Sequence, residues 1–249
     1  MNIKIIVAAH KPYQMPKDNI YLPLHVGREG KSDIGFQGDN TGENISEKNV
    51  NYCELTGLYW AWKNLDADYI GLAHYRRHFV GNKHCKDKWE RIAGKDEIEQ
   101  VLQNADVILP PKRNYFIETT YNQYAHAHHA VDLDTAREIL EEKSPKYLPA
   151  FDSCMKRTSG HKFNMLIMKR ELLDDYCTWL FDLLFELEER LDISAYSAND
   201  KRVFGFVSER LLDVWIGTNQ IEYREMPVLF MEKQNWVLKT GKFLRRKFK

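Results

Sequence analysis

One short apolar segment constrains this chain more than any other. Residues 69–73 (YIGLA) predict a buried strand, which ends abruptly in a polar cluster formed by His74, Tyr75, Arg76, Arg77 and His78. Open α/β sheets bind ligands at the carboxyl ends of their strands, so donors and cations gathered there favour an anionic ligand. The end of this strand is therefore the first candidate for an active centre.

Size and charge limit the classes of protein to consider. The 249 residues, 43% of them hydrophobic, suit one compact domain with a sizeable core. Lys plus Arg and Asp plus Glu both total 36 and cancel, so the chain lacks the basic field of a general nucleic-acid binder. We expect no nucleic-acid partner, and any recognition of anions must be local.

The cysteines indicate a reducing compartment. Cys53, Cys85, Cys154 and Cys177 are scattered without a Cys-x-x-Cys pair, which argues against a zinc knuckle and a disulfide framework. The apolar run at the N-terminus is too short for a signal peptide, and no stretch approaches the roughly 20 apolar residues of a membrane-spanning helix. We expect a cytoplasmic protein.

The hydrophobic pattern predicts alternating strands and helices. We expect strands over residues 3–8, 69–73, 105–109 and 163–169, an edge strand over 221–228, and helices over 52–64, 96–104, 132–142, 172–191 and 203–215. A polar loop is expected before residue 51, and Asn51 and Glu54 have the spacing of a helix-capping box. The alternation favours a parallel α/β sheet, and the lack of repeats or linkers favours one domain.

Five separated motifs occur in order along the chain. They are residues 39–42 (DNTG), 51–64 (NYCELTGLYWAWKN), 74–77 (HYRR), 124–129 (YAHAHH) and 204–215 (FGFVSERLLDVW). Together they resemble a family of bacterial capsular and exopolysaccharide biosynthesis proteins. That family, long labelled only as a domain of unknown function, is regarded as glycosyltransferases of the GT-A type. The resemblance spans nearly the whole chain.

The resemblance implies a Rossmann-type, GT-A-like α/β fold. Residues 1–110 would form a nucleotide-sugar-binding half, 111–235 an acceptor and catalytic half, and 236–249 a basic tail. It implies sugar transfer from a nucleotide diphosphate donor, commonly UDP-linked and here expected to carry galactose or galactofuranose, to a lipid-linked capsular or exopolysaccharide repeat unit. Linkage and stereochemical outcome stay open.

Candidates for binding the nucleotide follow the first strand and the loop after it. Ala8 would let a flat base approach the backbone, and His10 or Lys11 could meet the ribose or phosphate. Asp39 could hold a hydroxyl group, with Asn40 beside it. Ordinary strand exits and Asx turns explain these residues equally well.

Asn51 is a further donor-site candidate. As a helix cap it would stand at a helix N-terminus, which is a favourable place for a phosphate. Capping and proximity to the donor are therefore compatible.

GT-A enzymes mostly place an Asp-x-Asp metal motif after the fourth strand. This chain has His74, Tyr75 and Arg76 at the corresponding position. We expect Arg76 and Arg77 to neutralise the diphosphate with their planar, permanently charged forks, and we assign no metal ligand. Dependence on Mn²⁺ or Mg²⁺ stays open, and a surface ion pair at the strand end is the structural alternative.

A histidine-rich segment is a second candidate site. His126, His128 and His129, with Asp132 and Asp134, could coordinate zinc or manganese if the histidines alternate along extended backbone. Both acids also fit the first turn of a helix. We favour capping for the acids and contact with the acceptor sugar for His126 and His128.

His161 and Asn164 precede the central residues, 165–168, of a predicted strand, at a place where GT-A folds often contact sugars, although a turn explains them as well. In the last helix Glu209 lies off the apolar stripe, with Asp213 one turn further on. Glu209 is our candidate for the base that removes the acceptor proton, acting with Arg76 and His74 as the catalytic group. A surface ion pair with Arg202 or Arg210 is the alternative.

The tail, residues 236–249, interleaves basic with apolar residues. This pattern favours peripheral contact with the anionic inner face of the cell membrane, and a disordered solubilising tail is the alternative.

Two other functions stay open, a non-catalytic glycan- or nucleotide-binding module and a metal-dependent hydrolase built on the histidine segment. The transferase interpretation requires Arg76, Arg77 and an acid such as Glu209 to converge on one cleft.

Overall fold

The computed structural model describes residues 1–115 and 117–232, and its centre is a mixed sheet. The strand order is β10-β6-β9-β4-β1-β2-β3, with β5 joined to β4 and β11 to β5. The strands are β1 (Ile3–Ala9), β2 (Tyr21–His25), β3 (Gln37–Gly38), β4 (Tyr69–His74), β5 (Arg77–Phe79), β6 (Val107–Leu109), β9 (Leu166–Lys169), β10 (Arg224–Glu225) and β11 (Val228–Phe230). Strands β3, β2, β1 and β4 run parallel, whereas β9 is antiparallel to both of its neighbours.

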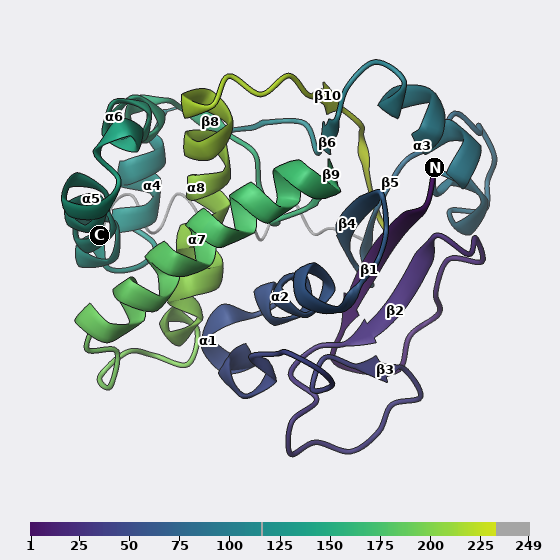
Figure 1. Ribbon diagram of the computed structural model, residues 1–249, viewed down its shortest axis with the longest axis horizontal. Helices are drawn as coiled ribbons and strands as arrows, with labels where there is room; N and C mark the ends of the chain where they lie inside the picture. The colour runs from purple at the N-terminus through teal and green to yellow at the C-terminus, as the bar shows by residue number, and fades with distance from the viewer. Residues whose placement is uncertain (116, 233–249) are drawn as a thin grey trace.

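Helices cover both faces of this sheet (Figure 1). On one face lie α2 (Leu55–Asn64) and α7 (Arg170–Arg190), with α1 (Asn49–Tyr52) and α8 (Val203–Thr218) packed beside them, and on the other α3 (Lys95–Leu102). Successive residues of β1 explain this arrangement, because Ile6 packs with the first set of helices and Ile5 with α3. A sheet buried on both faces produces the continuous apolar runs seen in the sequence.

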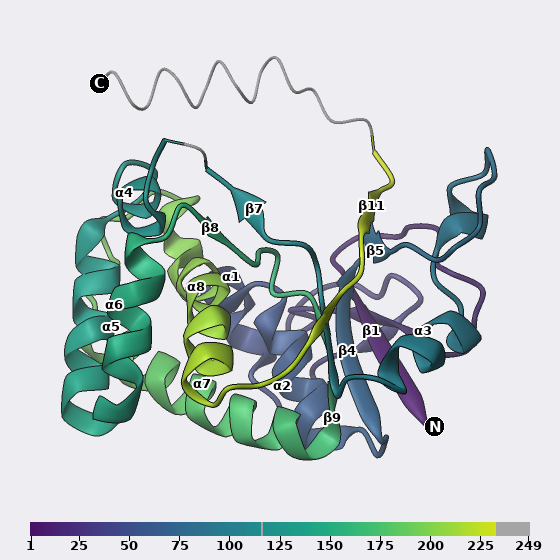
Figure 2. The same cartoon turned by 90° about the horizontal axis from the view of Figure 1, so that it is seen from above.

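A second group of helices packs against α8, away from the sheet (Figure 2). It contains α4 (Thr120–Ala125), α5 (Ala130–Lys143) and α6 (Leu148–Lys156). A separate two-stranded sheet, β7 (Arg113–Asn114) with β8 (Ser159–Gly160), lies between these helices and the β5–β11 pair (Figure 2). Short 3₁₀ turns occupy Ser46–Lys48, Trp89–Arg91, Pro145–Tyr147 and Asp200–Arg202.

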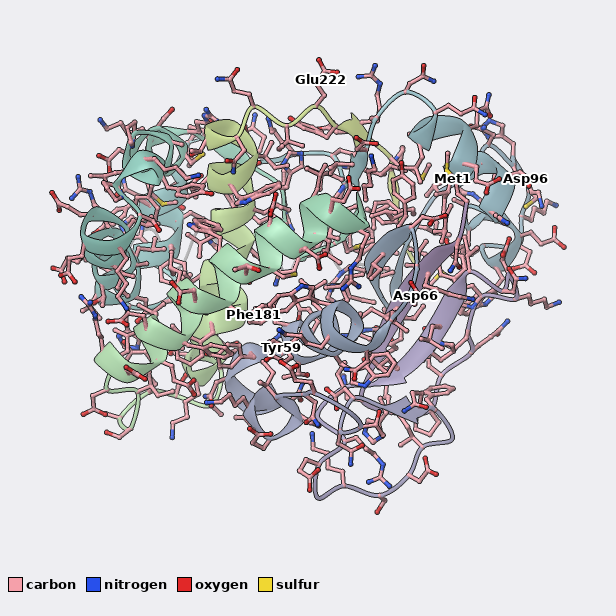
Figure 3. All side chains as sticks on the ribbon, viewed as in Figure 1. Met1, Tyr59, Asp66, Asp96, Phe181 and Glu222 are labelled. Carbon is pink, nitrogen blue, oxygen red and sulfur yellow. The ribbon has the colours of Figure 1, made fainter. Side chains whose placement is uncertain are left out.

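Aromatic side chains join the two long helices that cover the sheet. Tyr59 on α2 and Phe181 on α7 meet edge to face with ring centroids 4.9 Å apart (Figure 3). Trp62 stacks on the same phenylalanine at 5.9 Å. Such pairs add about 0.5–1.5 kcal/mol each beyond the area they bury. They fix α2, and with it the chain that leads into β4.

Several predicted elements differ in the structure. The segment expected as a polar loop contains β2 and β3, and Leu24 of β2 is fully buried beside Ala8. The predicted helix over 52–64 is broken at Cys53, which has a positive φ of 56°. Helices α4 and α6 were not predicted, and the edge strand over 221–228 is divided into β10 and β11. The parallel arrangement that the alternation favoured holds for β3, β2, β1 and β4, whereas β9 makes the sheet mixed because it runs antiparallel.

No helix in residues 1–115 and 117–232 is long and apolar enough to cross a membrane. The basic tail and its predicted membrane contact lie outside the described residues.

Candidate functional site

A pocket of about 710 Å³ opens at the carboxyl ends of β1 and β4, within the usual range for a small-molecule site. We call it the donor pocket, after the donor-site residues that were predicted from the sequence and lie here. The sequence candidates that line it are Ala8, His10, His74, Tyr75, Arg76, Arg77 and Glu209. Residues not predicted from the sequence complete the lining, namely Val26, Lys31, Asn49, Val50, Cys53, Glu54, Phe163, Arg202, Gly205 and Phe206.

Strand register explains why the first group meets. Ala8 and His74 are direct partners at the ends of the parallel strands β1 and β4, and the Tyr75 amide donates to the Ala8 carbonyl at 3.1 Å. The His10 ring then lies edge-on to Tyr75, with centroids 5.2 Å apart. Burial and the nearby Arg76 charge lower the pKa of His10, so this ring is neutral at pH 7.

The pocket carries more positive than negative charge. Four Lys and Arg side chains line it against two carboxylates, Glu54 and Glu209. Arg76 donates to Glu232 at 2.9 Å in a half-exposed ion pair, so the structural alternative is observed for this residue, which also lines the pocket. Arg77 lies over the Phe163 ring at 4.6 Å and forms no ion pair within the described chain. Burial lowers the pKa of the Arg77 guanidinium, which remains charged at neutral pH.

Arg202 is the second guanidinium of the pocket lining that has no carboxylate partner among the described residues. Its Nε donates to the Cys53 sulfur at 3.1 Å, and its Cζ lies 5.0 Å from the centre of the Phe206 ring. The guanidinium groups of Arg77 and Arg202 therefore lie against aromatic rings, and no acid among the described residues neutralises them. Two such forks from different elements suit a phosphate or diphosphate.

A left-handed turn at Phe163 and Asn164 organises the pocket. These residues have φ values of 77° and 53°, a conformation that non-glycine residues adopt rarely and mostly at functional positions. The Phe163 carbonyl accepts from His74 Nε2 at 2.6 Å, and the Phe163 amide donates to Glu209 Oε1 at 3.0 Å. Since a carbonyl only accepts, His74 carries its hydrogen on Nε2. Burial lowers the pKa of His74, which leaves Nδ1 as a lone-pair acceptor.

The sequence analysis expected Asn164 to contact a sugar, but in the structure its side chain bonds to neighbouring protein groups instead. It is 4% exposed, and its amide donates to Glu54 Oε1 at 2.8 Å and to the Gly205 carbonyl at 3.1 Å. Its oxygen accepts from Ser208 at 2.9 Å. All of its hydrogen-bonding groups are thus engaged by the protein, and one loop residue joins α2 to α8.

The two carboxylates differ in how far the protein satisfies them. Glu209 Oε1 accepts from the Phe163 amide, and Oε2 accepts from Arg210 at 3.1 Å, so the predicted ion pair and the pocket position coexist. Glu54 has one oxygen bonded to Asn164 and no bond to the other within the described residues. Glu54 is the freer acceptor of the pair.

The expected capping box at this place is wrong. Because Cys53 interrupts the helix, Glu54 stands at the N-cap of α2 and not at its third residue, and Asn51 donates to the Lys201 carbonyl at 2.7 Å. Asn51 therefore joins α1 to the turn before α8 instead of contacting the pocket.

Helix α8 supplies one wall through a single stripe. Arg202, Gly205, Phe206 and Glu209 follow the i, i+3, i+4, i+7 spacing of one helix face. A Cβ at Gly205 would come within 3.3 Å of Tyr52 and Cys53, so glycine lets α8 approach the α1–α2 junction closely. The stripe is visible in the sequence, and it would have identified Arg202 and Phe206 beside Glu209.

Three other donor-site candidates lie outside the lining. Asp39 is fully buried and accepts from the amides of Gly27 and Arg28 and the hydroxyls of Ser46 and Thr56, so it is a structural acid and not a ribose ligand. Asn40 donates to Glu29 at 3.3 Å on the surface. Lys11 lies 5.6 Å from the Tyr75 ring, outside the pocket.

The histidine segment does not form a metal centre. His126 bonds Glu118 and His128 bonds Asp200, each at 2.9 Å, and the segment is a turn between α4 and α5 and not an extended strand. His128 also stacks on Phe206 at 4.3 Å, behind the donor pocket. Across residues 1–115 and 117–232, no group of three or more His, Cys, Asp or Glu is arranged to hold a metal ion.

The remaining predictions for this region need correction. Asp132 accepts from Tyr124 and Tyr196, and Asp134 from Tyr121, so neither caps the helix through its side chain. His161 is 1% exposed and lies between Asp213 at 2.5 Å and Glu225 at 3.3 Å, where it joins α8 to β10. It is therefore not placed to contact a sugar.

Comparison with known proteins gives two matches. The family model described as Domain of unknown function (DUF4422) matches residues 4–220. The apo structure of the bifunctional glycosyltransferase WbbM superposes with a TM-score of 0.86 at 33% sequence identity, covering 94% of this chain and 46% of that one. The chain thus spans just under half of WbbM. No curated protein matches. The predicted GT-A-like α/β fold is confirmed.

Proposed function

Because the chain belongs to the family described as Domain of unknown function (DUF4422), and shares the fold of part of a bifunctional glycosyltransferase, we propose that it is itself a glycosyltransferase. In this proposal a nucleotide diphosphate sugar binds in the donor pocket, and its sugar passes to a glycan acceptor. The donor is UDP-linked and carries galactose or galactofuranose. The acceptor is a lipid-linked capsular or exopolysaccharide repeat unit at the inner face of the cell membrane.

One observation carries the proposal. Arg76 and Arg77 at the end of β4 converge with Glu54 at the start of α2 and Glu209 of α8 on one pocket at the carboxyl ends of parallel strands. This convergence is what transfer requires, because a departing diphosphate needs cations and an attacking hydroxyl needs an acceptor for its proton. A module that only binds glycans has no need for both in the same pocket.

Arg77 and Arg202 are the groups we assign to the diphosphate. No acid among the described residues neutralises their guanidinium groups. These groups would stabilise the leaving diphosphate most strongly as negative charge develops on it. Arg76, already paired with Glu232, would act at the rim.

The two carboxylates are assigned different tasks. In place of Glu209, the base expected from the sequence, we assign the acceptor proton to Glu54 if the reaction inverts configuration, because one Glu54 oxygen is unbonded within the described chain. Glu209, held by Phe163 and Arg210, stabilises positive charge that develops at the anomeric carbon. His74 Nδ1 adds a neutral acceptor for a sugar hydroxyl.

The Asp-x-Asp metal of other GT-A enzymes does not fit this strand end. The positions after β4 hold His74, Tyr75, Arg76 and Arg77, and the two pocket carboxylates are each bonded to protein donors. Cations placed where the acids would stand take over charge neutralisation, so the assigned steps use side chains alone.

Thermal unfolding against a panel of nucleotides and UDP-sugars, with and without chelator, tests the donor site. At a ligand concentration about one hundred times its Kd, binding should add about 2.7 kcal/mol to the free energy of unfolding. The gain should survive chelator, disappear in Arg77→Met and persist in Arg137→Met, which removes a surface arginine on α5.

Transfer itself is measured as sugar incorporated into glycan acceptor. Glu54→Gln should abolish it while nucleotide binding persists. If the folded protein binds no nucleotide sugar, or binds one but never transfers it, the transferase proposal fails and the binding module is favoured.

A further inference from the structure

A second group of cations lies beside Glu209, outside the donor pocket. It consists of Lys162, Arg113 and Arg210, with Tyr115 among them, and we call it the Lys162 cluster. These residues come from the β7–β8 region and from α8, which lie close together in Figure 2. Neither the family match nor the structural neighbour explains why so much positive charge gathers here.

Lys162 is the unusual member. It is 6% exposed, its Nζ lies 5.1 Å from the centre of the Tyr115 ring, and it forms no hydrogen bond or ion pair with any described residue. Burial and the adjacent Arg210 charge lower its pKa to about 7. A buried ammonium normally has an acidic partner, because removing its water without one is costly.

Arg210 is also incompletely satisfied. It is 5% exposed, and its Nη atoms donate to the Phe206 carbonyl, Glu209 and Gln123, but its buried Nε has no partner in residues 1–115 and 117–232. Arg113, on the exposed strand β7, forms no ion pair with described residues either. The cluster thus holds three cations against two carboxylates, Glu209, whose Oε2 is already bonded to Arg210, and Asp213, whose oxygens are bonded to His161.

Unpaired buried charge lowers stability unless a ligand supplies the counter-charge, and strain of this kind concentrates at functional sites. We propose that the Lys162 cluster binds an anionic group of the acceptor, either a phosphate or the carboxylate of an acidic sugar. This inference rests on the proposed transferase function. The two sources share one chemistry, an oxyanion that accepts hydrogen bonds from an ammonium and guanidinium groups.

The position of the cluster fits an acceptor and not the donor. The donor diphosphate is assigned to Arg77 and Arg202, on the pocket side of the Phe163 turn. Phe163 donates its amide to Glu209, and Lys162 is the residue immediately before it. An acceptor anchored at Lys162 would therefore extend past Glu209 towards the anomeric carbon.

Calorimetric titration with small probes tests the site directly, without turnover. The probes are methyl phosphate and methyl β-glucuronide, with neutral methyl β-glucoside as the control. Each is titrated into the full chain carrying Arg77→Met, which disables the donor site. We expect binding of at least one anionic probe and none of the glucoside. Adding Lys162→Met should weaken that binding about tenfold or more, as expected for losing a hydrogen bond between charged groups.

Two further readouts separate binding from a structural role. Affinity for methyl β-glucuronide should fall about tenfold from pH 6 to pH 8 as Lys162 loses its proton, because its carboxylate stays charged throughout. Lys162→Met should also raise the temperature of unfolding, since it removes an unpaired buried charge. The control Lys146→Met, which removes an exposed lysine that also lies over a tyrosine, should change neither quantity.

Binding of only the phosphate probe would identify a phosphate as the anchor, and binding of only the glucuronide would identify an acidic sugar. Either result supports the site. The inference is overturned if no anionic probe binds, or if the affinity is the same with Lys162→Met, while the wild-type chain still binds its nucleotide sugar. Loss of nucleotide-sugar binding in the wild type would instead contradict the proposed function.

Discussion

Lowering the pH from 7 to 4.5 should reduce the free energy of unfolding of this protein, and one histidine in particular should be responsible. His78, on β5, is fully buried between the rings of Tyr21 and Trp89, whose centroids lie 6.1 and 6.0 Å away. Neither of its ring nitrogens has a hydrogen-bond partner among the described residues. Burial lowers the pKa of His78 from 6.5 to about 4 and outweighs the nearby Tyr75 backbone, which raises it, because the imidazolium would have to form without water or an acid beside it.

The sign and size of the effect follow from the two pKa values. Above pH 6.5 the ring is neutral in both the folded and the unfolded chain and contributes no dependence on pH. Between pH 6.5 and about 4 the unfolded chain binds the proton and the folded chain does not, so stability falls with pH. At pH 4.5 the loss amounts to about 2.5 kcal/mol, from about 1.36 kcal/mol per pKa unit.

Urea unfolding from pH 7 to pH 4.5, compared between the wild type and His78→Phe, isolates this contribution from that of the carboxylates. The phenyl ring suits the aromatic surroundings and cannot titrate, so the difference in unfolding free energy should shift by about 2.5 kcal/mol in favour of the variant as the pH falls. His84→Phe, at an exposed position, is the matched control. A difference that stays constant with pH would refute the argument that His78 is held neutral by burial.

Three further predictions concern residues around the donor pocket. Asn164→Ala should destabilise the fold by about 2 kcal/mol or more, as measured by urea unfolding, because Glu54 loses a partner. Asn164→Gly should be less damaging because glycine tolerates the left-handed backbone, and equal losses in the two variants would argue against backbone strain. Gly205→Val should cost about 1–3 kcal/mol by overpacking against Cys53, measured in the same way, and unchanged stability would show that α8 can shift. Asp39→Asn should lower stability by about 2 kcal/mol or more while the Kd for the nucleotide sugar is unchanged, and a selectively raised Kd would restore Asp39 as a ligand.

The centre of the fold could be predicted because its signals are local. The apolar run at residues 69–73 specified β4, and the polar cluster after it located the pocket. The strand β2 was missed because Pro23 and neighbouring polar residues hide a segment that is buried only through its pairing with β1. The break at Cys53 was missed because a non-glycine residue with positive φ leaves no mark in the sequence.

The site was predicted in outline, and its errors have two causes. Asp39, His161 and Asn164 have the chemistry of ligands, yet their partners come from segments distant in sequence, and only the fold shows that those partners occupy them. His78 is different, because strand alternation alone separates it from Arg77. On β5 the arginine faces the pocket and the histidine faces the core.

Phe163 divides two tasks between its backbone and its side chain. Its amide and carbonyl hold Glu209 and His74, while its ring lines the pocket and supports Arg77. Any residue that tolerates the left-handed turn would keep those two backbone bonds, whatever side chain it carries. Substrate preference at this position can thus change, by natural variation or by design, without moving the groups that act on the substrate. Position 163 is the place where we would begin to alter selectivity.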